Sequence, residues 1–351
     1  LAASPGGQIM PPIMGAAAFL MAEYMDLPYA EVAVKAILPA ILYFSGIFIA
    51  VHLEAKKLGL QGIPRTELPK WGYLLRNLYL ILPLVLLVWL VSSGAKTMAT
   101  SAALSILASF IIGFIHLLAT NIRQMNGQGF GKILWLTVKA SLLSAVDALA
   151  AGAKGAITVA VACAMAGMIA GCITVTGLAS ILINAIVQLA GNATIIGLVL
   201  TILPSIVLGM GVPTTANYCI MASTCAPILI QLGFSPVAAH FFVFYFGIVA
   251  DITPPVALAA YAGSAIAKSN PMKTGINATK LAIAAFIVPY IFAYNPSMLF
   301  VGNVEWYDVL LISVTALLGL FGIAAALNGH LFRKIPMVLR LALVAGGVGM
   351  L

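Results

Sequence analysis

Charged side chains are almost absent from long stretches of this sequence, and their scarcity restricts what the chain can fold into. Only 7% of the 351 residues are Asp, Glu, Lys or Arg, and none occurs between Lys154 and Asp251. A soluble domain carries about 25% charged residues, and so few charges cannot cover a water-facing surface. At about 20 apolar residues per crossing, the chain has room for roughly nine to eleven spans or half-spans. The sequence therefore predicts an all-α polytopic membrane protein.

The positive charges that are present lie beside apolar runs, which is typical of the cytoplasmic loops of membrane proteins. Fourteen of the 17 Lys and Arg residues fall into four clusters: Lys56, Lys57, Arg65, Lys70 and Arg76; Arg123, Lys132 and Lys139; Lys268, Lys273 and Lys280; and Arg333, Lys334 and Arg340. No stripe of aromatic and basic residues accompanies them, so a nucleic acid is not an expected partner. This pattern predicts a multi-pass protein of a cell inner membrane.

Apolar runs of spanning length predict where the chain crosses the bilayer. Two or three spans fit within 155–210, where Gly177 and the Gly191-Asn192 pair punctuate an uncharged stretch. Before it, 121–153 is an amphipathic stretch that could lie in the membrane interface or brace other helices. The remaining full spans are expected over 31–53, 77–93, 100–120, 281–300, 307–328 and 336–351.

Prolines and glycines divide the region after residue 210 into shorter pieces. Residues 211–235 are apolar but interrupted near both ends by proline or glycine, which predicts a re-entrant helical hairpin. The apolar pieces 236–250 and 256–267 flank a Pro-Pro pair that begins at Pro254, which predicts a broken helix.

An internal repeat relates the start of the chain to this broken helix. Gln8–Ile13 (Gln-Ile-Met-Pro-Pro-Ile) aligns with Asp251–Val256 (Asp-Ile-Thr-Pro-Pro-Val) at an offset of 243 residues. Chance produces apolar identities easily, but it seldom places paired prolines at matching positions of two helical segments. The match continues with Ala16 and Ala259, Pro28 and Pro271 and, after a two-residue shift, Lys35 and Lys280.

The charges beside the two copies indicate opposite orientations. The loop after the first copy holds three acidic residues and no cation before Lys35, whereas the loop after the second holds Lys268 and Lys273. By the positive-inside rule, the first loop faces out and the second faces in. Inverted repeats with broken helices are typical of secondary transporters, whose binding sites lie near the bilayer midplane.

Two consecutive prolines should unwind about one helical turn, because each removes an N–H donor and clashes with the carbonyl four residues back. The freed carbonyls must be buried in protein or satisfied by water or a cation, since lipid cannot hydrogen-bond them. A plain helix kink is the alternative. A carboxylate at membrane depth, as at Asp251, points to a polar cavity or a cation, although Asp251 could instead cap the following half-helix near the interface.

The segment Gly209–Asn217 (Gly-Met-Gly-Val-Pro-Thr-Thr-Ala-Asn) is a second candidate site. Its glycines permit close backbone approach, and Pro213 can open a new helix with Thr214 and Thr215 in the first turn. The N-terminal end of such a half-helix favours an anion, whereas the preceding carbonyls and the hydroxyls could hold a cation. A capped turn without a ligand is the alternative.

Three functional classes can be compared at this point. A secondary transporter explains the inverted repeat and both breaks, whereas a channel more often shows a repeated filter or a ring of charges. An intramembrane enzyme needs a nucleophile with its base or a metal-binding constellation, and no such motif occurs in the sequence. We therefore expect a transporter rather than an enzyme, and no cofactor.

Three segments, together with the span end at 51–55, resemble the large membrane subunit of the TRAP (tripartite ATP-independent periplasmic) transporters, specifically the TAXI branch. They are Gly7–Gly15, Gly209–Ala216 and Ile252–Ala262. The similarity runs over most of residues 1–300.

The resemblance implies a sodium-coupled permease of the elevator type. Such permeases receive a small organic acid or amino acid from a periplasmic binding protein and work with a small four-helix membrane component, separate or fused. A channel-like or proton-coupled permease is the alternative. The sodium ligands expected by match are Met10, Pro11, Gly209, Gly211, Thr214, Thr253 and Pro254, with Asp251 added from the charge argument above, and the expected substrate contacts are Thr215 and Asn217.

This chain departs from the dicarboxylate branch, whose second hairpin often carries an acidic residue where this sequence reads Pro-Thr-Thr from Pro213 onward. No Arg in the expected site could clamp a carboxylate. The counterpart of the hairpin in the first copy is expected upstream of Leu1, so we expect a fragment of a longer protein that lacks its N-terminal part. Residues 1–351 are expected to form one transport domain, with the end of the first repeat at 1–53, connecting helices at 54–154, the second repeat at 155–300 and C-terminal helices at 301–351.

Overall fold

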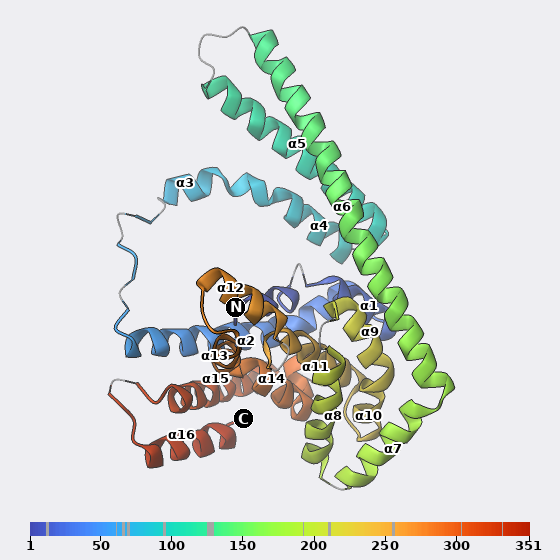
Figure 1. The fold of residues 1–351 in the computed structure, drawn as a ribbon, viewed down its shortest axis with the longest axis vertical. Coiled ribbons are helices and arrows are strands. Elements are labelled where there is room, and N and C mark those ends of the chain that lie inside the picture. The colour runs from blue at the N-terminus through green and yellow to red at the C-terminus, as the bar shows by residue number, and fades with distance from the viewer. Residues whose placement is uncertain are drawn as a thin grey trace. The chain divides into compact units, whose positions relative to one another are not determined.

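The structure is a computed structural model of the chain. It describes residues 1–11, 14–60, 62–64, 67–68, 71–93, 96–124, 130–191, 193–209, 212–254, 257–302, 304–331 and 333–351. Within these residues every regular element is a helix and no strand occurs (Figure 1), which confirms the predicted all-α class. The chain divides into two compact units, Gly62–Val161 and the combination of Leu1–Gln61 with Ala162–Leu351.

Two apolar helices of the smaller unit, α4 and α5, pack against each other. The span predicted over 100–120 corresponds to α5, in which Ala99–Ile122 is long and apolar enough to cross a membrane. The region 77–93, predicted as a full span, instead forms a shorter apolar helix, Leu78–Val91. The elements of this unit are α3 (Trp71–Arg76), the 3-10 helix η2 (Leu78–Ile81), α4 (Leu82–Ser92), α5 (Met98–Gln124) and the first part of α6 (Phe130–Val175).

The stretch predicted as a separate amphipathic segment, 121–153, instead belongs largely to α6, a single helix of 46 residues. No proline interrupts 130–175, and the strong helix former Ala recurs throughout. The helix therefore runs on into the region that was expected to hold further spans. It ends just before Gly177, whose φ of 69° lies in the left-handed region that favours glycine, so the predicted interruption at Gly177 is confirmed.

The larger unit holds the remaining elements. Of the C-terminal spans predicted over 281–300, 307–328 and 336–351, the second corresponds to α15 at spanning length. The first overlaps the end of a spanning segment that begins earlier, Pro271–Tyr294, and the third forms a shorter apolar helix, Met337–Gly349. The elements of this unit are η1 (Ser4–Gln8), α1 (Ala16–Tyr24), α2 (Tyr29–Lys57), α7 (Leu178–Ala190), α8 (Thr194–Gly209), α9 (Thr214–Thr224), α10 (Ala226–Gln231), α11 (Pro236–Val249), η3 (Ala250–Ile252), α12 (Leu258–Ala267), α13 (Pro271–Leu281), α14 (Ile283–Tyr294), η4 (Pro296–Leu299), α15 (Trp306–Asn328) and α16 (Met337–Gly349).

The centre of the larger unit is α11. Every residue from Ala238 to Val249 is buried, and the helix packs against α8, α9, α10 and α14 (Figure 1). A helix that is hydrophobic on all sides is expected to be buried on all sides, and four phenylalanines between 241 and 246 give α11 that character. The broken helix predicted from the sequence follows directly, because η3 and then α12 continue from its C-terminal end.

The helical hairpin begins earlier than predicted. α8 forms its first arm and α9 with α10 forms the second, and the two arms lie side by side (Figure 1). The tip therefore falls between Gly209 and Pro213, and the predicted range 211–235 covers little more than the second arm. The sequence predicts the first arm as part of a span because α8 is an apolar helix that continues through Pro204.

The internal repeat is present in the backbone as well as in the sequence. α1, shifted by 243 residues, coincides with α12 to within one residue. Met14 and Ala257, which are equivalent by this offset, both have positive φ, at 27° and 36°. The amide of Met14 donates to the carbonyl of Met10 at 3.3 Å, and the equivalent amide of Ala257 donates to Thr253 at 3.1 Å. The two copies therefore share a local fold, while their opposite orientation stays a prediction from charge.

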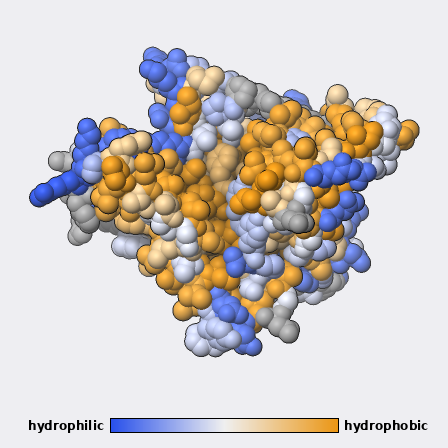
Figure 2. All heavy atoms as spheres, turned by 90° about the horizontal axis from the view of Figure 1, so that it is seen from below, coloured by the Kyte–Doolittle hydropathy of each residue, from blue (hydrophilic) through white to orange (hydrophobic). Residues whose placement is uncertain are grey.

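The described helices have the length and the apolar composition expected of helices in a bilayer. Five helical segments are long and apolar enough to cross a membrane, and α7 with the end of α6 forms a sixth, bent by 70°. Four shorter apolar helices accompany them in the described part of the chain. Figure 2 shows a face on which hydrophobic residues predominate and hydrophilic residues gather in separate groups.

Gly46 in α2 marks a close contact between helices, as small residues do in membrane proteins. A Cβ atom at Gly46 would collide with the Cβ of Ala284 in α14. We expect Gly46→Leu to destabilise the protein by about 1–3 kcal/mol through overpacking, measured as a lower thermal unfolding temperature in detergent. Gly113→Leu in α5, where no atom lies within 4 Å of the added Cβ, is the control. Equal unfolding temperatures for the two variants would contradict the close contact.

Candidate functional site

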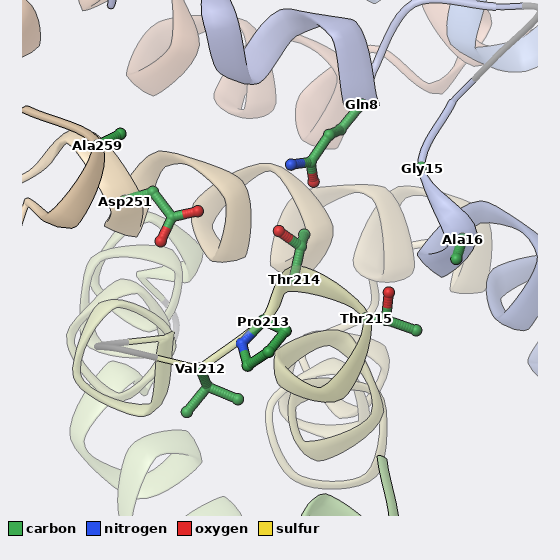
Figure 3. Close-up of a pocket in the computed structure, with 9 residues that line it drawn as sticks. All are labelled: Gln8, Gly15, Ala16, Val212, Pro213, Thr214, Thr215, Asp251 and Ala259. Carbon is green, nitrogen blue, oxygen red and sulfur yellow. The ribbon is translucent and has the colours of Figure 1, made fainter. Parts of the chain in front are cut away.

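A cavity of about 590 Å³ lies between the hairpin tip and the two breaks. Its walls come from the end of η1, the start of α1, the segment that leads into α9, and the region from η3 to α12. Figure 3 shows the side chains of Gln8, Thr214 and Asp251 directed toward a common space. The lining residues are Gln8, Gly15, Ala16, Val212, Pro213, Thr214, Thr215, Asp251 and Ala259.

Residues related by the internal repeat face each other across this cavity. Gln8 and Asp251 are equivalent at the offset of 243, and so are Ala16 and Ala259. Each copy thus contributes one polar side chain just before its break and one small residue just after it. The copies differ chemically, because Gln8 is neutral and can both donate and accept hydrogen bonds, whereas Asp251 carries a carboxylate that only accepts when ionised.

The hairpin tip adds hydroxyls and the N-terminal end of a helix. Pro213 occupies the N-cap position with an extended backbone (φ −54°, ψ 140°), and α9 starts at Thr214, as the sequence predicted. The first helical hydrogen bond runs from the amide of Asn217 to the carbonyl of Pro213 at 2.9 Å. The amides of the three preceding residues have no partner within the helix, as at any helix start. Thr214 and Thr215 therefore bring hydroxyls and free N–H groups to the same wall of the cavity.

Asp251 supplies the carboxylate of this site. It lies in η3 and is half-buried. In the described part of the chain, its carboxylate has neither an ion pair nor a hydrogen-bond donor, and the cavity lining includes no Lys or Arg. A carboxylate that is withdrawn from water without a compensating charge attracts a cation or a proton. Together with the hydroxyl of Thr214, it offers the oxygen ligands that hard cations prefer.

Two residues predicted for the site, Asn217 and Gly209, lie behind the tip rather than on the cavity wall. Asn217 is fully buried, and its Nδ2 donates to the carbonyl of Gly247 in α11 at 3.2 Å. An added Cβ on Gly209 would lie 2.7 Å from Asn217 Nδ2 and 2.8 Å from the Cβ of Ala250. The tip is therefore packed tightly against the end of α11, and these residues position the site instead of lining it.

The residues predicted at the two breaks are close to the cavity in sequence but do not line it. The carbonyls of Met10 and Thr253 are already occupied by the amides of Met14 and Ala257, and the Thr253 hydroxyl donates to the carbonyl of Val249 at 2.7 Å. Pro11 and Pro254 are likewise absent from the cavity wall. Gly211 lies outside the described residues.

The carbonyls that prolines were expected to free are in part satisfied within the protein. The carbonyl of Gln8, four residues before Pro12, accepts from the amide of Gly15 at 3.2 Å, and that of Ala250, four residues before Pro254, accepts from the amide of Thr253 at 3.2 Å. Burial in protein, one of the outcomes left open by the sequence, thus accounts for these groups. The side chains, rather than a ring of freed carbonyls, dominate the polar part of the cavity.

Sequence analysis missed Gln8, Gly15, Ala16 and Ala259 as site residues. The signal that would have found Gln8 was available, since the repeat aligns it with Asp251. The small residues carry no chemical signal of their own, and only their placement in the structure assigns them to the cavity wall.

Comparison with known protein families gives a match over most of the chain. The model of a family described as "Tripartite ATP-independent periplasmic transporter, DctM component" matches residues 1–307. The match covers every residue of the cavity and ends at the start of α15. No curated protein matches the chain.

Proposed function

Because the chain belongs to the family of the DctM component of tripartite ATP-independent periplasmic transporters and is thus a multi-pass permease subunit of the inner membrane, we propose that it couples sodium entry to solute uptake. The solute is a small organic acid or amino acid, delivered by a periplasmic binding protein. A small four-helix membrane component, separate or fused, completes the transporter. The segments that resemble the TAXI branch support a place for the chain in that branch of the family.

The observation that carries the proposal is the cavity in which Asp251 and Thr214 are brought together from two different elements (Figure 3). Sodium is a hard cation and takes oxygen ligands, as its divalent counterparts do. The Asp251 carboxylate supplies the compensating charge, and the hydroxyls of Thr214 and Thr215 supply neutral oxygens. A cation held here would join the hairpin tip to the end of α11, so that its binding orders both.

The same cavity offers groups suited to the carboxylate of a solute. The start of α9 presents free N–H groups, and the N-terminal end of a helix favours negative charge. The amide of Gln8 adds a donor on the opposite side. Without Lys or Arg among the described lining residues, a carboxylate would be bound by these dipoles with sodium as its counter-ion, which ties solute binding to the ion.

In the proposed mechanism, the cavity and its hairpin move together across the membrane in the manner of an elevator. The tight packing of the hairpin tip on α11, through Gly209 and Asn217, supports movement of these elements as one body. Broken helices at a repeat interface are the usual location of such alternating-access sites.

Uptake into liposomes tests the function directly. The full-length permease with its membrane partner would be reconstituted and supplied with the binding protein and a labelled solute, with and without an inward sodium gradient. Uptake that needs both the gradient and the binding protein supports the proposal. Uptake that proceeds equally with potassium on both sides contradicts sodium coupling.

A proton-coupled permease is the second candidate, and the unpartnered carboxylate of Asp251 favours it. A half-buried carboxylate without a cation can bind a proton as it changes sides. Uptake that needs the binding protein and an inward proton gradient, but not sodium, would select this mechanism within the same family.

Replacing single threonines with valine tests which hydroxyl binds sodium. We expect Thr214→Val to raise the sodium concentration for half-maximal uptake by about fivefold to tenfold, the loss of one hydrogen-bond-sized interaction. Thr253→Val should also weaken sodium dependence, but less, since the Thr253 hydroxyl lies off the cavity wall and donates to Val249. Thr→Ser at both positions keeps the oxygen and is the control. Unchanged sodium dependence in both valine variants would refute the assignment of these ligands.

A further inference from the structure

A second cavity, of about 460 Å³, lies where several helices end, away from the hairpin tip and the two breaks. It is formed by the last turn of α2, the last turn of α13, the C-terminal end of α15 and the start of α16. Four cationic side chains line it: Lys57, Lys280, Lys334 and Arg340. None of these residues belongs to the site described above.

The cations of this basic pocket exceed the acids beside it. Glu54 is the one carboxylate that pairs with them in the described part of the chain, at 3.3 Å from Lys57 and 3.8 Å from Lys280. No ion pair is found there for Lys334 or Arg340. The pocket therefore carries a surplus of positive charge that Glu54 cannot neutralise.

One of the four cations, Arg340, is used within the protein to cap a helix. Arg340 donates from Nε to the carbonyl of Ala326 at 2.6 Å and from Nη2 to that of Leu327 at 3.3 Å. These bonds cap the C-terminal end of α15, where a cation is favourable. Lys57, Lys280 and Lys334 make no such bond to a carbonyl among the described contacts, so helix capping does not account for their convergence.

Two polar atoms in the wall of the basic pocket are also left without partners. His330 Nδ1 and Asn328 Oδ1 are buried and form no hydrogen bond with any described residue, although Asn328 Nδ2 donates to the carbonyl of Ala50 at 3.2 Å. Buried polar atoms normally have partners. A ligand with an anionic oxygen and a hydroxyl would supply both, since His330 can donate to the oxygen and Asn328 can accept from the hydroxyl.

We propose that the basic pocket binds a phosphate group, presented either by the headgroup of an anionic phospholipid or by a free phosphate. The charge pattern assigns Lys57 and Lys334 to clusters that face the cytoplasm, and the pocket lies at the ends of the apolar helices α2 and α15. Anionic lipids are concentrated in that leaflet and bind to basic pockets between membrane helices. A bound phosphate would link the first repeat, the second repeat and the C-terminal helices, whatever solute the permease carries.

Two arms of one experiment test the proposal and distinguish the sources. In the first, the full-length permease is placed in nanodiscs of equal parts phosphatidylethanolamine and phosphatidylglycerol, and native mass spectrometry measures which lipid is retained. In the second, it is placed in nanodiscs of phosphatidylcholine alone, and calorimetry measures binding of inorganic phosphate. Each arm compares the natural protein with Lys57→Gln/Lys334→Gln and with the control Arg333→Gln/Lys273→Gln, which removes two exposed cations outside the pocket.

We expect the natural protein and the control to retain phosphatidylglycerol selectively, and the pocket variant to lose at least about tenfold of that preference, since a direct bond between a cation and the phosphate contributes about tenfold or more. A natural protein that shows no lipid preference but binds inorganic phosphate, with that binding lost only in the pocket variant, would support the site and identify a soluble ligand. A pocket variant that unfolds at the same temperature as the control and matches it in both arms would overturn the proposal.

Discussion

Replacing Asp251 with Asn is expected to reduce ion-driven uptake by about 10- to 100-fold, which corresponds to the 1.5–3 kcal/mol that an interaction with a charged group contributes. The carboxylate is the one charged group on the wall of the described cavity, and no protein donor satisfies it there. Asn keeps the shape but removes the charge that would hold the coupling ion. Initial rates of uptake into liposomes, with thermal unfolding as a check on folding, measure the effect.

The matched control for this variant is Asp308→Asn in the first turn of α15, which makes the same chemical change away from the cavity. Its uptake should stay close to that of the natural protein. Equal uptake by the two variants would show that coupling does not depend on the carboxylate of Asp251. If uptake by the natural protein depends on a proton gradient but not on sodium, and Asp251→Asn loses that dependence, the second candidate function is favoured.

The second large effect is expected for Gly209→Val at the hairpin tip. A Cβ here would come within 3 Å of Asn217 Nδ2 and of the Ala250 Cβ, so the tip has to move away from the end of α11. A shift of about 1 Å in binding groups can cost up to about 100-fold in function, and we expect uptake to fall by at least about tenfold. Gly209→Ala should give a smaller loss in the same direction.

The control is Gly346→Val in α16, where no atom lies within 4 Å of the added Cβ. The unfolding temperature of Gly209→Val should fall modestly, because overpacking costs about 1–3 kcal/mol. Normal uptake by Gly209→Val, at an unchanged sodium requirement, would mean that the packing of the tip on α11 is not needed for transport.

Much of the fold follows from the distribution of charge and proline. The scarcity of charge predicts the helical membrane class, and the Pro-Pro pairs predict both breaks. The alignment of Gln8 with Asp251 predicts a repeat that extends to backbone detail, down to the positive φ of Met14 and Ala257. These features could be predicted because each depends on a local rule, such as the missing N–H of proline.

The composition of the cavity could not be predicted in the same way. The side chains of Asn217 and Thr253 are as polar as those of Thr214 and Thr215, yet the first two bond to carbonyls of or near α11 while the latter two reach the cavity. Which of two polar neighbours faces a cavity depends on the packing of distant segments, and the sequence alone does not contain that information. The first arm of the hairpin was missed for a related reason, since an apolar half-helix and a full span share one pattern.

The length of α6 has a consequence for its course through the membrane. Its 46 residues measure about 69 Å along the axis, whereas a bilayer with its headgroups is about 40–45 Å thick. The helix is therefore longer than one upright crossing requires, and the excess length must be taken up by tilt, by a bend or by an end that extends past the headgroups. Four exposed charged residues lie along α6 at intervals of 7, 8 and 7 residues: Lys132, Lys139, Asp147 and Lys154. Such spacing keeps them on one face of the helix, and a charged face of this kind is most stable where it meets the headgroups or other polar groups rather than the lipid tails.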